Sequence, residues 1–240
     1  MLGGLIGEGE FRVNFGSSGN WLTSVNLRNI FNAAFPGVTG PVRVVFTQAG
    51  NIGSNRSFAY ALTTGTWDAG SEIVLRVPTA TESESTPNGL ILGQGGGTNG
   101  NATGVAINLQ YNLQIFNRGI IGGGGGNGAD RGGPRGNGGG GGGFPSGGPS
   151  EGSGPGSLFD GGGGSGGSGF GGGLGKLGGC ASYCPSQVAP AIRRNGWTYS
   201  FVADDDGTPS PNPWFAGNPG QRSNICRPIS NPADRNGGVS

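Results

Sequence analysis

GLILGQGGG, residues 89–97, returns as GIIGGGG at residues 119–125. Each copy follows a segment with the composition of a β-strand, residues 73–77 before the first copy and residues 107–115 before the second. The same order of a strand, a glycine, apolar residues and then polyglycine therefore occurs twice. A flexible linker gains nothing from such a repeat, so the pattern predicts an ordered architecture.

The second copy opens a glycine-rich region, residues 119–179, that holds more than half of the 59 glycines of the chain. Gly- and Ser-rich segments usually form flexible coil, because glycine loses the most backbone entropy on ordering. Glycine also forms three-residue-per-turn helices whose N–H and C=O groups must bond to neighbouring helices or water. Cα–H···O contacts add to that packing where side chains are absent.

Aromatic and proline residues interrupt this region at a spacing that favours packed helices. The interruptions fall about 11–15 residues apart, which corresponds to glycine helices of roughly 25–40 Å. We therefore predict short packed helices joined by loops, with a disordered Gly/Ser/Pro linker as the alternative. The main interrupting residues are Phe144, Pro145, Pro149, Pro155, Leu158, Phe159, Asp160 and Phe170.

The N-terminal part of the chain has the pattern of a small β-rich domain. Apolar residues recur at helical spacing between Val25 and Phe35, where Pro36 and Gly37 end the predicted helix. Alternating or continuous apolar runs predict strands. These strands are residues 10–15, 42–46, 57–62 and 72–77.

The C-terminal part, residues 180–240, is rich in aromatic residues and proline. Residues 194–202 have the composition of a turn followed by a strand. Its three cysteines leave two alternatives open: a disulfide that joins Cys226 to Cys180 or Cys184, or three reduced thiols.

The predicted fold class is therefore mainly β with one N-terminal helix. A small β-rich assembly and attachment domain occupies residues 1–88. A body of packed polyglycine-II-like helices with irregular loops follows at residues 89–179, and an aromatic- and proline-rich segment at residues 180–240 ends the chain.

The composition excludes several classes of function. The net charge is +1 and only 11% of residues are charged, whereas nucleic-acid binding requires clustered Lys and Arg. Without histidine there is no imidazole base, and no motif for a catalytic site, a metal or a cofactor is found. The sequence shows no secretory signal and no membrane-spanning run. We therefore expect a protein that is not an enzyme, is made in a cytoplasm and does not insert into membranes.

Several motifs resemble one known family. The run ALTTGTWDAGSEI at residues 61–73, the run VNLR at residues 25–28 and the doubled glycine unit are similar to a module of glycine-rich tail-tip and tail-fibre proteins of tailed bacteriophages. The resemblance covers about residues 20–130. A looser similarity exists to small adhesins that cap T-even-like long tail fibres, in which loops between packed glycine helices contact the host. The chain departs from the family pattern at Arg76, Val77 and Pro78 and in a ten-residue insertion.

This resemblance implies a structural adhesin at a phage tail tip or fibre, located in the virion and made in the host cytoplasm. Its implied partners are other phage tail proteins and a bacterial surface receptor, protein or glycan, with a homotrimer as one assembly. The alternative is a purely structural tail or baseplate component without receptor contact. The residues expected to contact a receptor are Phe144, Pro145, Leu158, Phe159, Phe170, Trp214 and Phe215.

Overall fold

The computed structural model describes most of the N-terminal half of the chain and parts of the remainder. The described residues are 3–6, 9–54, 60–79, 88–95, 104–125, 144, 189–203, 213–216 and 225–228. Within residues 3–6, 213–216 and 225–228 only the backbone is described. All structural statements below concern these residues.

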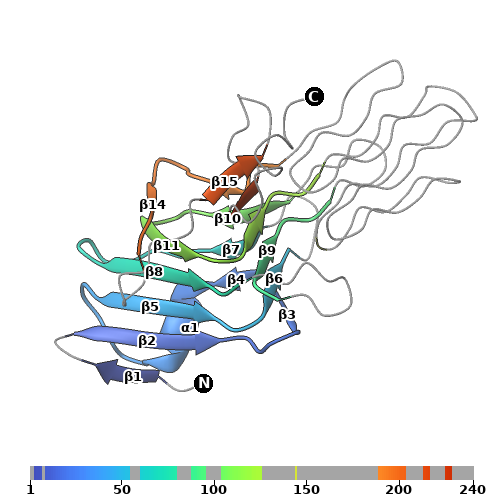
Figure 1. The fold of residues 1–240 in the computed structure, drawn as a ribbon. Coiled ribbons are helices and arrows are strands. Elements are labelled where there is room, and N and C mark those ends of the chain that lie inside the picture. The colour runs from blue at the N-terminus through green and yellow to red at the C-terminus, as the bar shows by residue number, and fades with distance from the viewer. Residues whose placement is uncertain are drawn as a thin grey trace, which may run out of the picture.

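Three β-sheets and one short helix, α1 (Leu27–Ala34), make up the described fold (Figure 1). Sheet A contains, in spatial order, β1 (Gly3–Ile6), β2 (Glu10–Phe15), β5 (Arg43–Gln48), β8 (Glu72–Val77), β11 (Leu113–Asn117) and β14 (Tyr199–Phe201). Sheet B contains β15 (Pro213–Ala216), β16 (Ile225–Pro228), β12 (Ile120–Gly122), β9 (Leu90–Leu92), β6 (Asn51–Gly53) and β3 (Trp21–Thr23). Sheet C contains β13 (Ile192–Arg193), β10 (Val105–Asn108), β7 (Tyr60–Thr63) and β4 (Val25–Asn26).

The chain visits the sheets in the order A, B, C and then returns to A, so that each round adds one strand to every sheet. We call one such round a coil. The first coil is β2, β3 and β4, and the fourth is β11, β12 and β13. Strands of successive coils pair in parallel, whereas β1, β15 and β16 pair antiparallel at the sheet ends. The described fold is therefore a three-sided parallel β-solenoid.

The doubled glycine unit corresponds to two successive coils. Strand β9 lies in register with β12, so that Ile91 pairs with Ile121, and the strands that precede them, β8 and β11, are also paired. The repeat therefore indicates order, as predicted, and each copy marks the same point on the solenoid. The prediction of a mainly β protein with a single helix in the described residues is also confirmed.

The core lies inside the solenoid and is built from ladders of apolar side chains. Ile52, Ile91 and Ile121 form one fully buried row on sheet B. A second row on sheet A contains Phe46, Leu75 and Ile115. Burial of one such side chain contributes about 1.5–3 kcal/mol, so these rows hold the coils together.

Helix α1 closes the core near the first coil (Figure 1). The Asn26 side chain caps it by accepting a hydrogen bond from the Asn29 N–H at 3.1 Å. Leu27 and Phe31 are fully buried against the core. The helix ends at Ala34 with Phe35 as its C-cap, and Gly37 then adopts a φ of +83°, which side-chain-bearing residues rarely adopt.

Two sequence predictions differ from the structure. Residues 107–115 were expected to form one strand, but a corner at residues 109–112 separates β10 from β11, because the chain must turn from sheet C to sheet A. Glycine helices were expected from residue 89 onward. The described residues between 89 and 125 instead form strands β9 to β12, because their apolar side chains extend the core of the preceding coils.

A row of charged side chains lies on the outer face of sheet A. Arg43 stands between Glu10 and Glu72 and forms ion pairs with both, the Nε–Oε2 distance to Glu10 being 2.8 Å. Arg12 contacts the other oxygen of Glu10 at 2.7 Å. The hydrogen bond from Arg43 holds the pKa of Glu10 below its ordinary value of 4.5, against a smaller opposing effect of burial.

We expect the substitution Glu10→Gln to lower stability at neutral pH by less than about 1 kcal/mol, since the pair is partly exposed. Because the folded state binds the Glu10 proton less tightly than the unfolded state, this contribution is complete above pH 4.5 and is lost as the pH falls through the lowered pKa. Thermal melting of the original protein and of Glu10→Gln from pH 7 to pH 3 measures this contribution to stability. A Tm difference that does not shrink on acidification would contradict the prediction.

Candidate functional site

The corner between sheets B and C differs in length from coil to coil. In the first coil it is Ser24 alone, which adopts a φ of +52°. In the second and third coils it spans residues 54–59 and 93–104, and in the fourth it spans residues 123–191. The glycine-rich region is therefore almost entirely one insertion at this corner, which we call the B–C corner.

Backbone hydrogen bonds connect the coils at the base of these insertions. Ser54 N–H donates to Leu92 O at 3.2 Å, and Gly93 N–H donates to Gly122 O at 2.9 Å. Beyond the strands, Gly104 donates to Gln94 O and Gly124 donates to Gly104 O. The backbones of three insertion segments thus lie side by side.

Glycine is required at this base because the backbones approach too closely for a side chain. A Cβ atom at Gly93 would lie 1.9 Å from Gly104 O, and one at Gly124 would lie 1.7 Å from Gln94 O. At Gly123 the nearest atom would be Ala189 O at 2.0 Å. Side-chain-free backbone packing, which we expected throughout the glycine-rich region, is present here. The rest of the segment predicted to form polyglycine helices, residues 126–179, lies outside the described residues, apart from Phe144.

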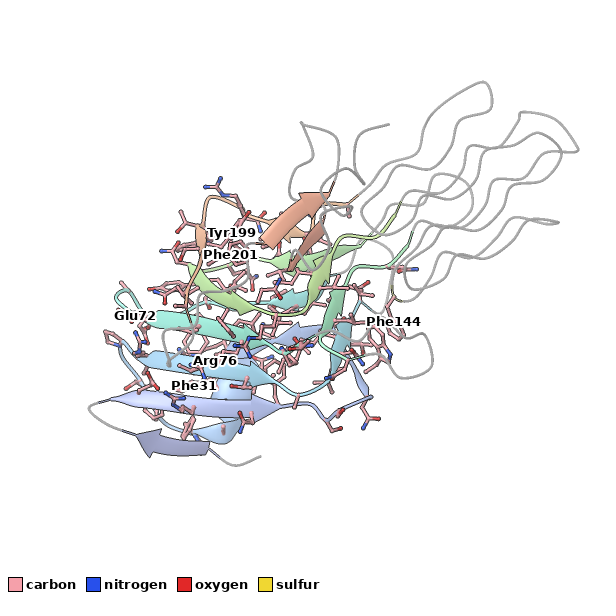
Figure 2. The ribbon with its side chains drawn as sticks, in the orientation of Figure 1. Phe31, Glu72, Arg76, Phe144, Tyr199 and Phe201 are labelled. Carbon is pink, nitrogen blue, oxygen red and sulfur yellow. The ribbon has the colours of Figure 1, made fainter. Side chains whose placement is uncertain are left out.

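Phe144 returns from the long insertion to the outer face of sheet B (Figure 2). Its ring stacks on Trp21 with a centroid distance of 3.7 Å and an interplanar angle of 5°. Its N–H donates to Gly93 O at 3.0 Å, and its carbonyl accepts from Ser54 Oγ at 3.2 Å. A Cβ atom at Gly53 would lie 2.0 Å from the Phe144 ring, so Gly53 provides the space for it. Phe144 therefore anchors the insertion to the first three coils.

We expect Phe144→Ala to release this anchor while the core of the solenoid stays folded. Loss of a stacked aromatic contact costs roughly 1 kcal/mol beyond the lost burial, which raises local opening severalfold. Hydrogen exchange should then accelerate at Ser54 and at the backbone around Gly93.

Two further variants make the Phe144 test specific. Phe144→Tyr keeps the ring and should preserve protection, whereas Gly53→Ala should displace the ring and act like Phe144→Ala. Unchanged exchange in both Phe144→Ala and Gly53→Ala would contradict the anchor.

The other residues predicted to contact a receptor are placed only in part. Trp214 and Phe215 lie on β15, which forms one end of sheet B, and pair with Arg227 and Cys226 of β16. Pro145, Leu158, Phe159 and Phe170 lie outside the described residues, as do Cys180 and Cys184. The role of these residues in receptor contact stays a prediction.

Sequence reasoning missed the B–C corner itself and the docking position of Phe144 on Trp21. The repeat offered a signal for the corner, because glycine-rich sequence follows a short apolar run, residues 90–92 and 120–121, at both positions that the register aligns. Among the described residues no group of three acidic, Cys or His side chains could hold a metal ion. None of the described helices is long and apolar enough to cross a membrane.

Together, the fold and the corner define a parallel β-solenoid that carries glycine-rich insertions of increasing length at one edge. The chain belongs to the family of the phage tail fibre adhesin Gp38, whose model matches residues 10–219. No curated protein matches it in sequence. The protein is therefore a bacteriophage tail-fibre adhesin, a structural component of the phage tail that serves host attachment; its family is not an enzyme family.

A solved structure shares this fold. The chain is similar to one in the crystal structure of the gp37-gp38 adhesin tip complex of the bacteriophage S16 long tail fiber. The match has a TM-score of 0.50 at 18% sequence identity and covers 81% of this chain and 79% of the other.

Proposed function

We propose that this adhesin joins a phage tail to the host surface with two different parts of the solenoid. The first coil would dock on another tail protein, and the insertions at the B–C corner would hold loops toward a bacterial receptor, protein or glycan. The observation that supports this division is the graded length of the corner. It is a single residue in the first coil and longest in the fourth.

The first coil has features suited to docking. Strands β3 and β4 form the ends of sheets B and C, so one side of each lacks a strand partner among the described residues. The half-buried apolar side chains Phe11, Ile30 and Phe35 lie beside the core near α1. Exposed strand edges and apolar surface favour association with another protein. The gp38-like relative was solved in a complex with gp37, which supports a tail protein as partner.

The anchored base of the glycine-rich region supports the proposed role of the long insertion in receptor contact. Close backbone packing at Gly93, Gly104 and Gly124 fixes where the long insertion leaves the solenoid. A fixed base reduces the entropy that loops lose on binding, and several copies on one particle would add avidity. Synthesis in the host cytoplasm and assembly as a homotrimer remain part of this proposal.

Adsorption competition tests the proposal against a purely structural role. Purified adhesin should coat host cells and slow attachment of the phage, and a chain that lacks residues 126–143 and 145–188 should not. Phage particles that are produced with the shortened chain should still incorporate it, because its first coil is intact. Protein that neither coats cells nor slows attachment would favour the alternative of a tail component without receptor contact.

A further inference from the structure

A polar groove lies on the side of the solenoid where sheet C leads into sheet A. It has a volume of about 430 Å³, which is within the range of ligand sites. The starts of β8, β11 and β14 form it, and Figure 2 shows Glu72 and Tyr199 of these strands on the side opposite to Phe144. It is lined by Ser71, Glu72, Ile73, Asn112, Leu113, Gln114, Thr198, Tyr199 and Ser200.

Neutral hydrogen-bonding groups dominate this groove. The Asn112 Oδ1 atom accepts from the N–H and the hydroxyl of Thr198, at 3.0 and 2.9 Å. This fixes the amide so that its Nδ2 donors remain available. Gln114 and the exposed Ser200 add a further amide and hydroxyl. The carboxylate of Glu72 is the only charged group in the lining and is already paired with Arg43.

An exposed aromatic residue is the neighbour in the chain of one residue that lines the groove. Trp197 immediately precedes Thr198 and is the most exposed large apolar side chain among the described residues, at 37%. Its ring lies 5.2 Å from Tyr111, which is buried and donates from its hydroxyl to Asp68 O. The indole packs on Tyr111 and leaves about a third of the residue open to contact with a ligand.

Hydrogen bonds hold the turn before Trp197. Asn195 and Gly196 have φ values of +48° and +87°, and the Asn195 amide donates to Asn108 Oδ1 at 2.7 Å and to Leu109 O at 3.0 Å. The Trp197 N–H also donates to Arg194 O at 2.8 Å. The ring is therefore presented at a defined place, which lowers the entropic cost of binding.

We propose that this groove binds a neutral saccharide, with Trp197 packing against the apolar face of a sugar ring. Amides and hydroxyls match the hydroxyls of a sugar as both donors and acceptors. A peptide would usually need an apolar anchor pocket, but the apolar lining side chains Ile73 and Leu113 are buried in the core. The site is separate from the B–C corner and does not depend on receptor contact by the insertion.

Titration of the purified full-length chain tests this assignment. The probes are maltopentaose, chitopentaose and a galactan pentasaccharide, followed by tryptophan fluorescence and by saturation-transfer NMR. We expect at least one of them to bind. Trp197→Ala should weaken that binding about tenfold, and Trp197→Phe should retain most of it.

A second variant tests the groove without changing the turn that holds Trp197. Ser200 lies at an exposed position of β14. The substitution Ser200→Arg should block the groove while the melting temperature stays unchanged. Absence of binding by all three probes at about 10 mM, or binding that survives Ser200→Arg, would overturn the proposal. Binding of a peptide library that Ser200→Arg abolishes, without saccharide binding, would overturn it as well.

Discussion

Gly124→Ala should destabilise the base of the glycine-rich insertion by about 3 kcal/mol or more, because the new methyl group would overlap backbone that cannot rotate away. The Cβ atom would lie 1.7 Å from Gln94 O and 2.4 Å from Gln94 C. Gly124 also donates to Gly104 O and accepts from Ala189 N–H, so a shift breaks bonds on two sides. The melting temperature of the purified variant and the adsorption rate of particles that carry it should both fall.

Gly37→Ala is the matched control. A Cβ atom there meets nothing within 4 Å, but its φ of +83° imposes a conformational cost of about 1 kcal/mol. Because Gly124 does not have a positive φ, it lacks this conformational cost, and the difference between the two variants is a lower bound on the cost of backbone contact. Equal melting temperatures for Gly124→Ala and Gly37→Ala would show that the insertions are not packed against each other at their base.

Local pattern was sufficient to predict those elements whose packing faces are set by nearby residues. The strands at residues 10–15 and 72–77 and the helix around Phe31 follow from apolar spacing within one segment. The glycine repeat also predicted order correctly, since both copies occupy equivalent positions of neighbouring coils.

The solenoid itself was not predicted because its contacts join residues with no shared local pattern. Leu113 pairs with Tyr199 across the whole long insertion, and Trp21 finds its stacking partner in Phe144. Composition suggested a domain boundary near residue 88, yet strands on both sides of that residue pair within the same sheets. Phe144 was expected to face a receptor because it interrupts polyglycine. That same interruption also provides the side chain that docks on Gly53.

Phe31→Ala should cost about 3–5 kcal/mol, because it removes the central ring of the aromatic cluster around α1 and leaves a cavity. Phe31 is fully buried and its ring lies 5.3 Å from Phe11, 5.4 Å from Phe35 and 5.3 Å from Trp67. A loss of this size lowers the melting temperature by about 10 °C. Circular dichroism melting measures it, and Phe31→Leu, which refills most of the volume, should recover much of the loss.

The variant Phe35→Ala distinguishes the contribution of this cluster to stability from its proposed role in docking. It belongs to the same cluster but is only half-buried, so Phe35→Ala should cost less stability than Phe31→Ala. If the first coil docks on another tail protein, Phe35→Ala should still reduce the amount of adhesin in purified particles, because its ring would be covered in the complex. The amount of adhesin in particles could instead depend only on the melting temperature across Phe31→Ala, Phe31→Leu and Phe35→Ala. This end of the solenoid would then contribute only folding stability, and the docking surface would have to lie elsewhere on the solenoid.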